Sequence, residues 1–279
     1  MTPVTGITMA AFVACFLPVM IGLIQGWLTI PDAAHGILIA PVALWLAWKS
    51  GTRPAPRPDH WSGVIILVFA VSLNIIGRTA GVATVPRVAL LIALVGLTIW
   101  YAGWRQVTAW WLPFILLALT IPLPESIIAA ITLPLQGIAA RLGASLIAWR
   151  HVPVVVSGNI ITLPGHTLFV SEACSGLRSL TALVSMAILI GALFLHKPLT
   201  RLLMVATAVG VAIFINGVRV FLTGFLVFFV DPKLGEGFMH LTQGYLLFLV
   251  SLMILAGVTW LFMVGERRFA GESRRPRTA

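Results

Sequence analysis

The chain has 279 residues, of which 59% are hydrophobic and only 9% are charged. A soluble domain carries about 25% charged residues, so this composition predicts a single polytopic domain of an integral membrane protein. The net charge of +10 does not indicate nucleic-acid binding, because much of it lies in short loops and in the terminal segment ERRFAGESRRPRTA, where basic residues set membrane topology.

Eight apolar segments are candidates for crossing a bilayer. The first has no basic residues before it and no Ala-x-Ala site, so we expect a retained span and not a cleaved signal. The second is short, and we expect it to be tilted or partly re-entrant. The segments cover residues 7–28, 36–49, 61–77, 87–103, 107–123, 175–196, 200–222 and 240–264.

The basic residues predict the orientation of these spans. With the N-terminus in the cytoplasm, the cytoplasmic segments hold eleven Lys and Arg residues and the opposite side holds seven. Several of the seven lie in long or membrane-embedded segments, which weigh less in setting topology. We therefore expect both termini in the cytoplasm, with residues 266–279 as a basic tail that contacts anionic lipid head groups.

The region between the fifth and sixth spans is the least membrane-like. Residues 123–149 predict an amphipathic helix in the interface plane, because Gln136 and Arg141 interrupt an apolar surface that a proline bends. The segment VPVVVSGNIITLPGHTLFVSEA predicts a β-hairpin, since β-branched runs flank Ser-Gly-Asn and Pro-Gly turns. The predicted fold class is an all-α polytopic membrane protein of about eight transmembrane helices, with this helix and hairpin on the outer side.

Three reactive side chains are predicted at one membrane depth. Cys174 begins the sixth span, and His240 begins the eighth. Arg219 lies about 19 residues into the seventh span, a rise of close to 30 Å that also reaches the outer face. Taken alone, the cysteine is a small packing residue, the arginine snorkels to head groups and the histidine marks a helix start. Their shared depth favours function, because ionisable groups within spans are costly.

The chemistry that fits a thiol, an imidazole and a guanidinium is acyl transfer. A nearby cation and the N-terminal turn of a helix both favour the thiolate of Cys174. The imidazole of His240 can take the thiol proton and later protonate a leaving amine. The permanently charged Arg219 can stabilise the oxyanion of the tetrahedral intermediate.

Neighbouring polar residues have open roles. Glu172 either orients His240, pairs with an arginine or caps the helix start. Asn216 either hydrogen-bonds Arg219, one turn later, or joins two helices. Arg178 binds either a substrate carboxylate or a lipid phosphate.

The sequence predicts neither a metal site nor a cofactor. The six histidines and two cysteines show no His-x-x-x-His or Cys-x-x-Cys spacing, and only eight residues are acidic. There is no glycine-rich nucleotide loop and no serine nucleophile elbow. Cys15 and Cys174 are not expected to pair, because they lie at different depths.

These residues resemble, in order, the three motif blocks of the exosortase/archaeosortase family. The blocks are EACSGLRS, which contains Glu172, Cys174 and Ser175, then Asn216-Gly-Val-Arg219, then His240. An early block with Asp32 and His35 and the proline-rich stretch from Pro122 to Gln136 are also similar, so residues 1–265 correspond to the family's transmembrane domain. His35 either lines a substrate groove or anchors a helix end.

The resemblance implies a sorting enzyme of the bacterial inner membrane whose site faces the periplasm. Such enzymes cleave C-terminal sorting signals of exported proteins, consisting of a Pro-Glu-Pro motif, an apolar span and a basic end, and pass the acyl group to an acceptor. The family pattern gives Cys174 as nucleophile, Arg219 as oxyanion stabiliser and His240 as general acid/base.

The resemblance also bears on partners. These would be exported proteins, membrane lipids and exopolysaccharide-assembly proteins. The chain ends soon after the eighth span, so any additional periplasmic domain is expected on a separate protein. The alternative is a non-catalytic component or lipid-linked-sugar carrier of exopolysaccharide export, which would use Arg178 and Arg219 to bind phosphate.

Overall fold

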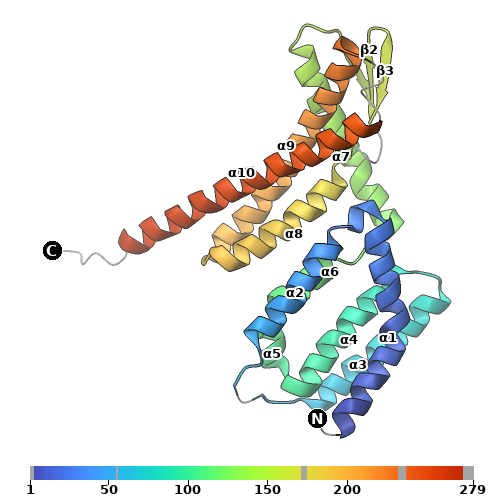
Figure 1. The fold of residues 1–279 in the computed structure, drawn as a ribbon, viewed down its shortest axis with the longest axis vertical. Coiled ribbons are helices and arrows are strands. Elements are labelled where there is room, and N and C mark those ends of the chain that lie inside the picture. Colours follow the sequence, from blue (N-terminus) through green and yellow to red (C-terminus); the bar gives the residue numbers. More distant parts are fainter. Residues whose placement is uncertain (1–2, 55, 171–174, 232–236, 273–279) are drawn as a thin grey trace, which may run out of the picture. The chain divides into compact units, whose positions relative to one another are not determined.

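A computed structural model describes residues 3–54, 56–170, 175–231 and 237–272, except for the side chains of residues 3–4, 237–241 and 269–272. The chain divides into two compact units, Met1–Pro124 and Glu125–Ala279, and each is described by itself. Within the described residues, eight helices are long and apolar enough to cross a membrane. The predicted all-α polytopic membrane class is therefore confirmed, with one small sheet in the second unit (Figure 1).

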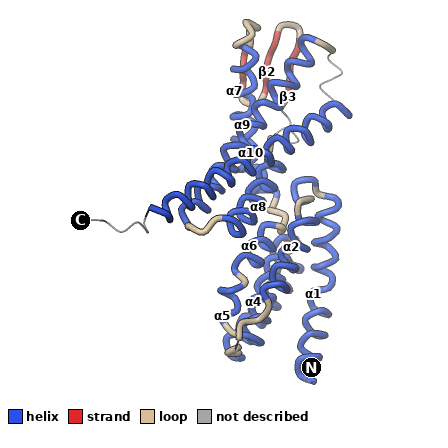
Figure 2. Tube along the Cα trace, turned by 60° about the vertical axis from the view of Figure 1, so that its left-hand side comes forward, coloured by secondary structure: helices blue, strands red, loops and turns tan. Residues whose placement is uncertain are grey.

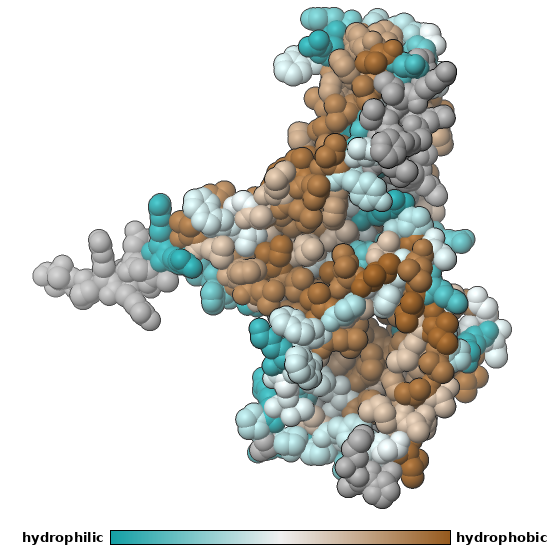
Figure 3. All heavy atoms as spheres, viewed as in Figure 1, coloured by the Kyte–Doolittle hydropathy of each residue, from teal (hydrophilic) through white to brown (hydrophobic). Residues whose placement is uncertain are grey.

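Apolar side chains cover the outer faces of the helices in both units (Figure 3). Leu38 and Ile65 in the first unit and Leu202 and Leu249 in the second are examples, each largely exposed. A soluble protein rarely exposes apolar surface on this scale, whereas lipid tails cover it at no cost. The exposed surface agrees with a multipass membrane protein.

The first unit contains six α-helices and one short 3-10 helix in its described residues. They are α1 (Pro3–Thr29), η1 (Pro31–Ala33), α2 (Gly36–Ser50), α3 (His60–Thr79), α4 (Thr84–Ala102), α5 (Trp104–Ala109) and α6 (Trp111–Leu119). Helices α3 and α4 form a hairpin in which Gly63 lies against the backbone of Trp100 and Gly77 lies against Val85. Small residues at these positions let the two helices approach closely, as in other membrane helix pairs.

The single span predicted over residues 107–123 is wrong, because this region forms the two short helices α5 and α6. The break falls at Ala109 and Trp110, and Pro113 explains it. A proline has no N–H to donate and its ring clashes with the carbonyl four residues earlier, which here is that of Ala109. The fifth of the eight candidate spans is instead α7 (Glu125–Ala148), the segment predicted to lie in the interface plane.

The second unit holds the sheet and the remaining long helices. After α7 come β1 (Val155–Ser157), β2 (Ile160–Leu163) and β3 (His166–Phe169), then α8 (Leu177–Phe194), α9 (Pro198–Phe229) and α10 (Gly237–Glu272). In both views the strands lie beside α7 and α9 (Figures 1 and 2).

The predicted hairpin is extended to a three-stranded antiparallel sheet in the order β1-β2-β3. Both predicted turns are present, and each joins its strands through two residues: Gly158 and Asn159, then Pro164 and Gly165. Both glycines have positive φ, which these tight turns require. Ile161 and Leu163 of β2 are buried against α7 and α9 in one apolar core.

Helix α9 is the central element of the second unit. It runs parallel to α7, since Leu142 and Gly143 contact Gly217 and Val220 while Ile147 contacts Gly224. Its other side packs against α8 and α10 in a separate apolar core. Helix α7 therefore contacts residues 217–224 of α9, whereas the apolar core shared with α8 and α10 involves its residues 204–212.

Candidate active site

Two of the predicted site residues, Cys174 and Glu172, lie outside the described residues. The backbone of His240 belongs to the first turn of α10, but its side chain is also outside the description. The assignment of Cys174, Arg219 and His240 as a catalytic set therefore stays a prediction. The described residues that flank these three in the chain show which helices lie near the predicted site.

The start of α8 packs directly on Asn216. Gly176, two residues after Cys174, precedes the helix with a φ of 83°, a conformation that favours glycine. A Cβ added to Gly176 would lie 2.7 Å from the Asn216 Cγ, so a side chain there would collide with the amide. Asn216 is only 6% exposed, and this contact supports its predicted role in joining two helices.

Ser175 is also buried in this region, with 3% of its surface exposed. Its Oγ accepts a hydrogen bond of 3.3 Å from the backbone N–H of Leu177, one of the N–H groups that a helix start leaves without an intrahelical partner. Ser175 therefore caps the start of α8.

Arg219 is half-buried on α9, one turn after Asn216, and its guanidinium lies against α10. A Cβ added to Gly244 would be 3.3 Å from Nη2 of Arg219. One turn further along α9, the hydroxyl of Thr223 donates to Oε1 of Gln243 at 3.2 Å. These contacts fix α10 against α9 within one turn of His240, which precedes Gly244 by four residues.

The described neighbours of all three predicted catalytic residues thus meet on one stretch of α9. Gly176 approaches it from α8 and Gly244 approaches it from α10, while Arg219 belongs to it. The arrangement provides a permanent cation beside the starts of two other helices.

The strand before Cys174 is held by a polar contact that the sequence did not reveal. The backbone carbonyl of Asn159 accepts a hydrogen bond of 2.9 Å from the N–H of Val170. The side-chain Nδ2 of Asn159 donates to the carbonyl oxygen of Val170 at 3.4 Å. The same amide donates to Oε1 of Gln136 at 3.2 Å, and Gln136 is only 3% exposed on α7. The position of Asn159 in a predicted turn gave no signal for this long-range bond.

Arg178 lies in the first turn of α8 with an exposed side chain. Its exposure is compatible with either a carboxylate or a phosphate ligand, so both alternatives for this residue stay predictions.

His35 belongs to the first unit, where it joins the start of α2 to the end of α6. Its Nε2 lies 3.0 Å from the backbone carbonyl oxygen of Leu119. A carbonyl only accepts, so Nε2 carries the proton; Nδ1 is buried and has no hydrogen-bond partner among the described residues. The adjacent Trp27 Nε1 donates to the Thr120 carbonyl at 2.8 Å. These bonds support the alternative in which His35 anchors a helix end.

No group of three or more His, Cys, Asp or Glu side chains that could hold a metal ion occurs within the described ranges. The described polar side chains around residues 216–223 of α9 are instead the guanidinium of Arg219, the amides of Asn216 and Gln243 and the hydroxyl of Thr223. Such groups bind and orient a peptide or stabilise negative charge.

Comparison with known proteins identifies the family. No curated protein and no solved structure gives a significant match. A family model described as transmembrane exosortase matches residues 27–257, a range that contains α8, α9 and the start of α10. The family implies exported proteins as substrates in general. The chain is therefore a multipass membrane protein that belongs to the transmembrane exosortase family.

Proposed function

We propose that the chain is a membrane-embedded cysteine transpeptidase or protease that processes exported proteins at their C-terminal sorting signals. Cys174 is the nucleophile, His240 is the general acid/base and Arg219 stabilises the oxyanion. The proposed substrates carry a Pro-Glu-Pro motif followed by an apolar span and a basic end.

The observation that carries the proposal is the convergence on α9. Gly176 lies against Asn216, and Gly244 lies against the guanidinium of Arg219. Cys174 supplies a thiol two residues before Gly176, and His240 supplies an imidazole four residues before Gly244. A thiol, an imidazole and a guanidinium are the groups that acyl transfer through a thioester requires.

In the proposed reaction, His240 takes the proton of the Cys174 thiol, and the thiolate attacks the carbonyl carbon of the scissile peptide bond. The guanidinium of Arg219 stabilises the negative charge on the carbonyl oxygen. As the C–N bond breaks, His240 returns the proton to the leaving amine, and the acyl group remains on Cys174 as a thioester. An acceptor nucleophile then displaces the thiol.

The proposed site lies at the periplasmic face of the bacterial inner membrane, with both chain termini in the cytoplasm. The length of α9 supports this depth, because the 22 residues from Pro198 to Arg219 rise about 30 Å, which is the thickness of the apolar core of a bilayer. Lys197 and Arg201 at the other end of that rise suit a cytoplasmic face. Proteins of exopolysaccharide assembly are proposed partners.

The activation of Cys174 is tested directly by thiol labelling. In a Cys15→Ala background Cys174 is the only thiol, and a membrane-impermeant alkylating reagent is applied from the periplasmic side. We expect fast labelling that slows in His240→Ala, because the imidazole no longer favours the thiolate.

The control is Cys174→Ala in the same background, which removes the labelled position. Slow labelling that is unchanged by His240→Ala would contradict an activated nucleophile. Under the alternative of a phosphate-binding carrier, Cys174 is an ordinary packing residue and gives that result.

A further inference from the structure

A pocket of about 220 Å³ lies where the turn between α8 and α9 meets the last turns of α10. It is lined by Phe194, His196, Lys197, Met263, Glu266 and Arg267. The α9 rise places this pocket at the end of the helix opposite Arg219, so it is separate from the proposed catalytic neighbourhood.

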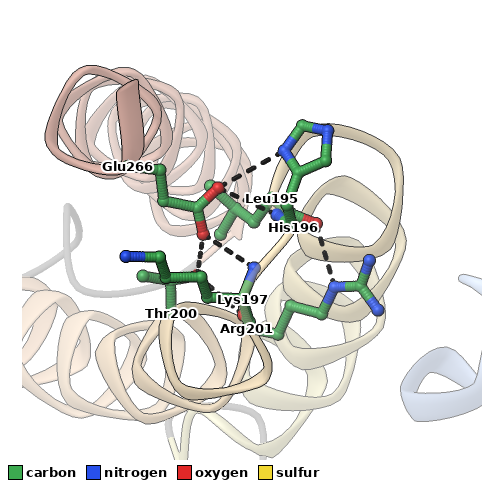
Figure 4. Close-up of polar contacts among 6 residues, drawn as sticks. All are labelled: Leu195, His196, Lys197, Thr200, Arg201 and Glu266. Atoms are coloured by element: carbon green, nitrogen blue, oxygen red, sulfur yellow. Dashed lines mark hydrogen bonds and ion pairs between the residues drawn. The ribbon is translucent and has the colours of Figure 1, made fainter. Parts of the chain in front are cut away.

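Glu266, the one acidic residue of the lining, forms hydrogen bonds with other residues of the chain (Figure 4). Glu266 is buried, and its two oxygens accept hydrogen bonds of 2.9 Å from the backbone N–H groups of His196 and Lys197. It also accepts from the hydroxyl of Thr200, and Nδ1 of His196 lies 3.4 Å away. The carboxylate thus caps the start of α9, and its charge is directed at the helix N–H groups.

The remaining charge of the pocket is positive. The side chains of Lys197, in the turn, and Arg267, on α10, both line the pocket and are exposed. His196 is 90% exposed beside them. The apolar part of the lining consists of the half-exposed Phe194 and of Met263. Cations beside apolar side chains complement an amphiphile that has an anionic head group.

The membrane depth of the pocket indicates which kind of amphiphile it can bind. Helices α8, α9 and α10 are all candidate membrane spans that begin or end here. Large apolar side chains, including Leu193, Leu199 and Leu261, are exposed next to the basic rim. The pocket therefore lies where a lipid-facing surface meets charged residues, which is the level of phospholipid head groups.

We propose that this pocket binds one anionic phospholipid, with its phosphate at Lys197 and Arg267 and the start of an acyl chain against Phe194 and Met263. The proposal does not depend on the catalytic activity. Binding at this pocket would be specific for one class of lipid, and it would act in addition to the general attraction of the basic tail for a membrane surface.

The test uses the full chain purified in a neutral detergent. Short-chain phosphatidylglycerol or phosphatidylcholine is added, and the midpoint of thermal unfolding is followed, because a ligand that binds only the folded state raises it. We expect phosphatidylglycerol to raise the midpoint and phosphatidylcholine to leave it unchanged. In Lys197→Gln/Arg267→Gln the shift should fall to about half or less.

For a matched control, Arg267→Gln alone is compared with Arg268→Gln, which removes the same single charge one residue outside the lining and should keep the full shift. Met263→Trp is a second variant that fills the pocket while keeping every charge, and it should also lose the shift. Lys197→Arg keeps the charge and should retain the shift.

Three outcomes would overturn the proposal. An equal shift with phosphatidylcholine would show a purely apolar effect. An equal shift with inorganic phosphate at matched ionic strength would show a soluble anion site. An equal loss in Arg268→Gln would show diffuse charge attraction and not a pocket.

Discussion

Two glycines determine how closely the predicted catalytic segments approach α9. Gly176 brings the start of α8 onto Asn216, and Gly244 brings α10 onto Arg219. At each position a side chain would take up the space that the neighbouring polar group now occupies. The contacts that require glycine join distant parts of the sequence, and at Gly176 the positive φ adds a local requirement.

Substitution of Gly176 tests the first contact. Gly176→Ala meets two obstacles, the left-handed backbone, which costs an alanine about 1–2 kcal/mol, and the collision with Asn216. Gly165→Ala is the control, since Gly165 also has positive φ but has nothing within 4 Å of its added Cβ. We expect Gly176→Ala to lower the thermal unfolding midpoint more than Gly165→Ala and to abolish substrate processing. Equal midpoints would show that the Asn216 contact contributes nothing.

Substitution of Gly244 tests the second contact. In Gly244→Ala the new methyl group is 3.3 Å from Nη2 of Arg219, so the guanidinium must move by a few tenths of an ångström. We expect processing to fall roughly 10-fold, because displacement of a catalytic group is costly to the rate, while the unfolding midpoint changes little. Gly257→Ala on the same helix has open space and should leave both unchanged. Normal processing by Gly244→Ala would contradict a role for Arg219 at this position.

Candidate site residues could be chosen from the sequence, but the contacts around them could not be predicted. Arg219 and Asn216 stand out as polar groups inside an apolar run. The bond between Asn159 and Gln136 joins residues 23 positions apart, and neither residue signals the other in the sequence. Such contacts depend on how α7 and the sheet pack, which local patterns do not encode.

Among the elements, α3 begins with a side-chain cap that makes its stability depend on pH. Asp59 accepts hydrogen bonds from the hydroxyl of Ser62 at 2.7 Å and from its backbone N–H at 3.1 Å. The hydrogen bond from the Ser62 side chain, followed by that from its backbone, lowers the pKa of Asp59 below its usual range. The folded state therefore binds this proton less readily than the unfolded state, and the cap stabilises the fold above the ordinary carboxyl pKa of about 3.9.

We expect Asp59→Ala to lower the unfolding midpoint at neutral pH. The difference from wild type should shrink as pH falls below about 3.9 and through the lowered folded pKa, where the carboxylate of the wild type becomes protonated. Thermal unfolding measured from neutral to acid pH checks this. A difference that is independent of pH would show that the carboxylate charge is not what stabilises α3.

Glu266 connects three elements, because this residue of α10 accepts hydrogen bonds from backbone N–H groups in the turn that joins α8 to α9. Glu266→Gln keeps the size of the side chain but removes its charge and one acceptor oxygen, so we expect the unfolding midpoint to fall by several degrees. Glu125→Gln makes the same change at an exposed position in α7 and should be nearly neutral. An equal effect of the two substitutions would contradict the role of Glu266 as a cap.

Long apolar runs predicted most helices well, whereas breaks and strand number were harder to predict. The run over 107–123 satisfies the composition of a span, yet Pro113 divides it into α5 and α6. The glycine turns of the sheet were evident because positive φ is a local requirement. That two turns join three short strands follows from burial of Ile161 and Leu163 against helices, which is not a local property.

At the scale of the whole molecule, the two proposed functions lie at opposite ends of the second unit. The end of α9 near Arg219 gathers the neighbours of the predicted catalytic residues, while the end near Glu266 presents cations and an apolar pocket. A rise of about 30 Å between them matches one bilayer core. Catalysis and lipid binding are accordingly proposed on opposite faces of one membrane.

Cys174 is proposed to carry the acyl group during processing of a sorting signal. The most direct measurement is the gel shift of a co-expressed exported protein with a Pro-Glu-Pro tail, with wild type compared to Cys174→Ala and to the control Cys15→Ala. We expect wild type and Cys15→Ala to shorten the substrate and Cys174→Ala to leave it at full length. Processing by Cys174→Ala at the wild-type level would contradict this role of Cys174.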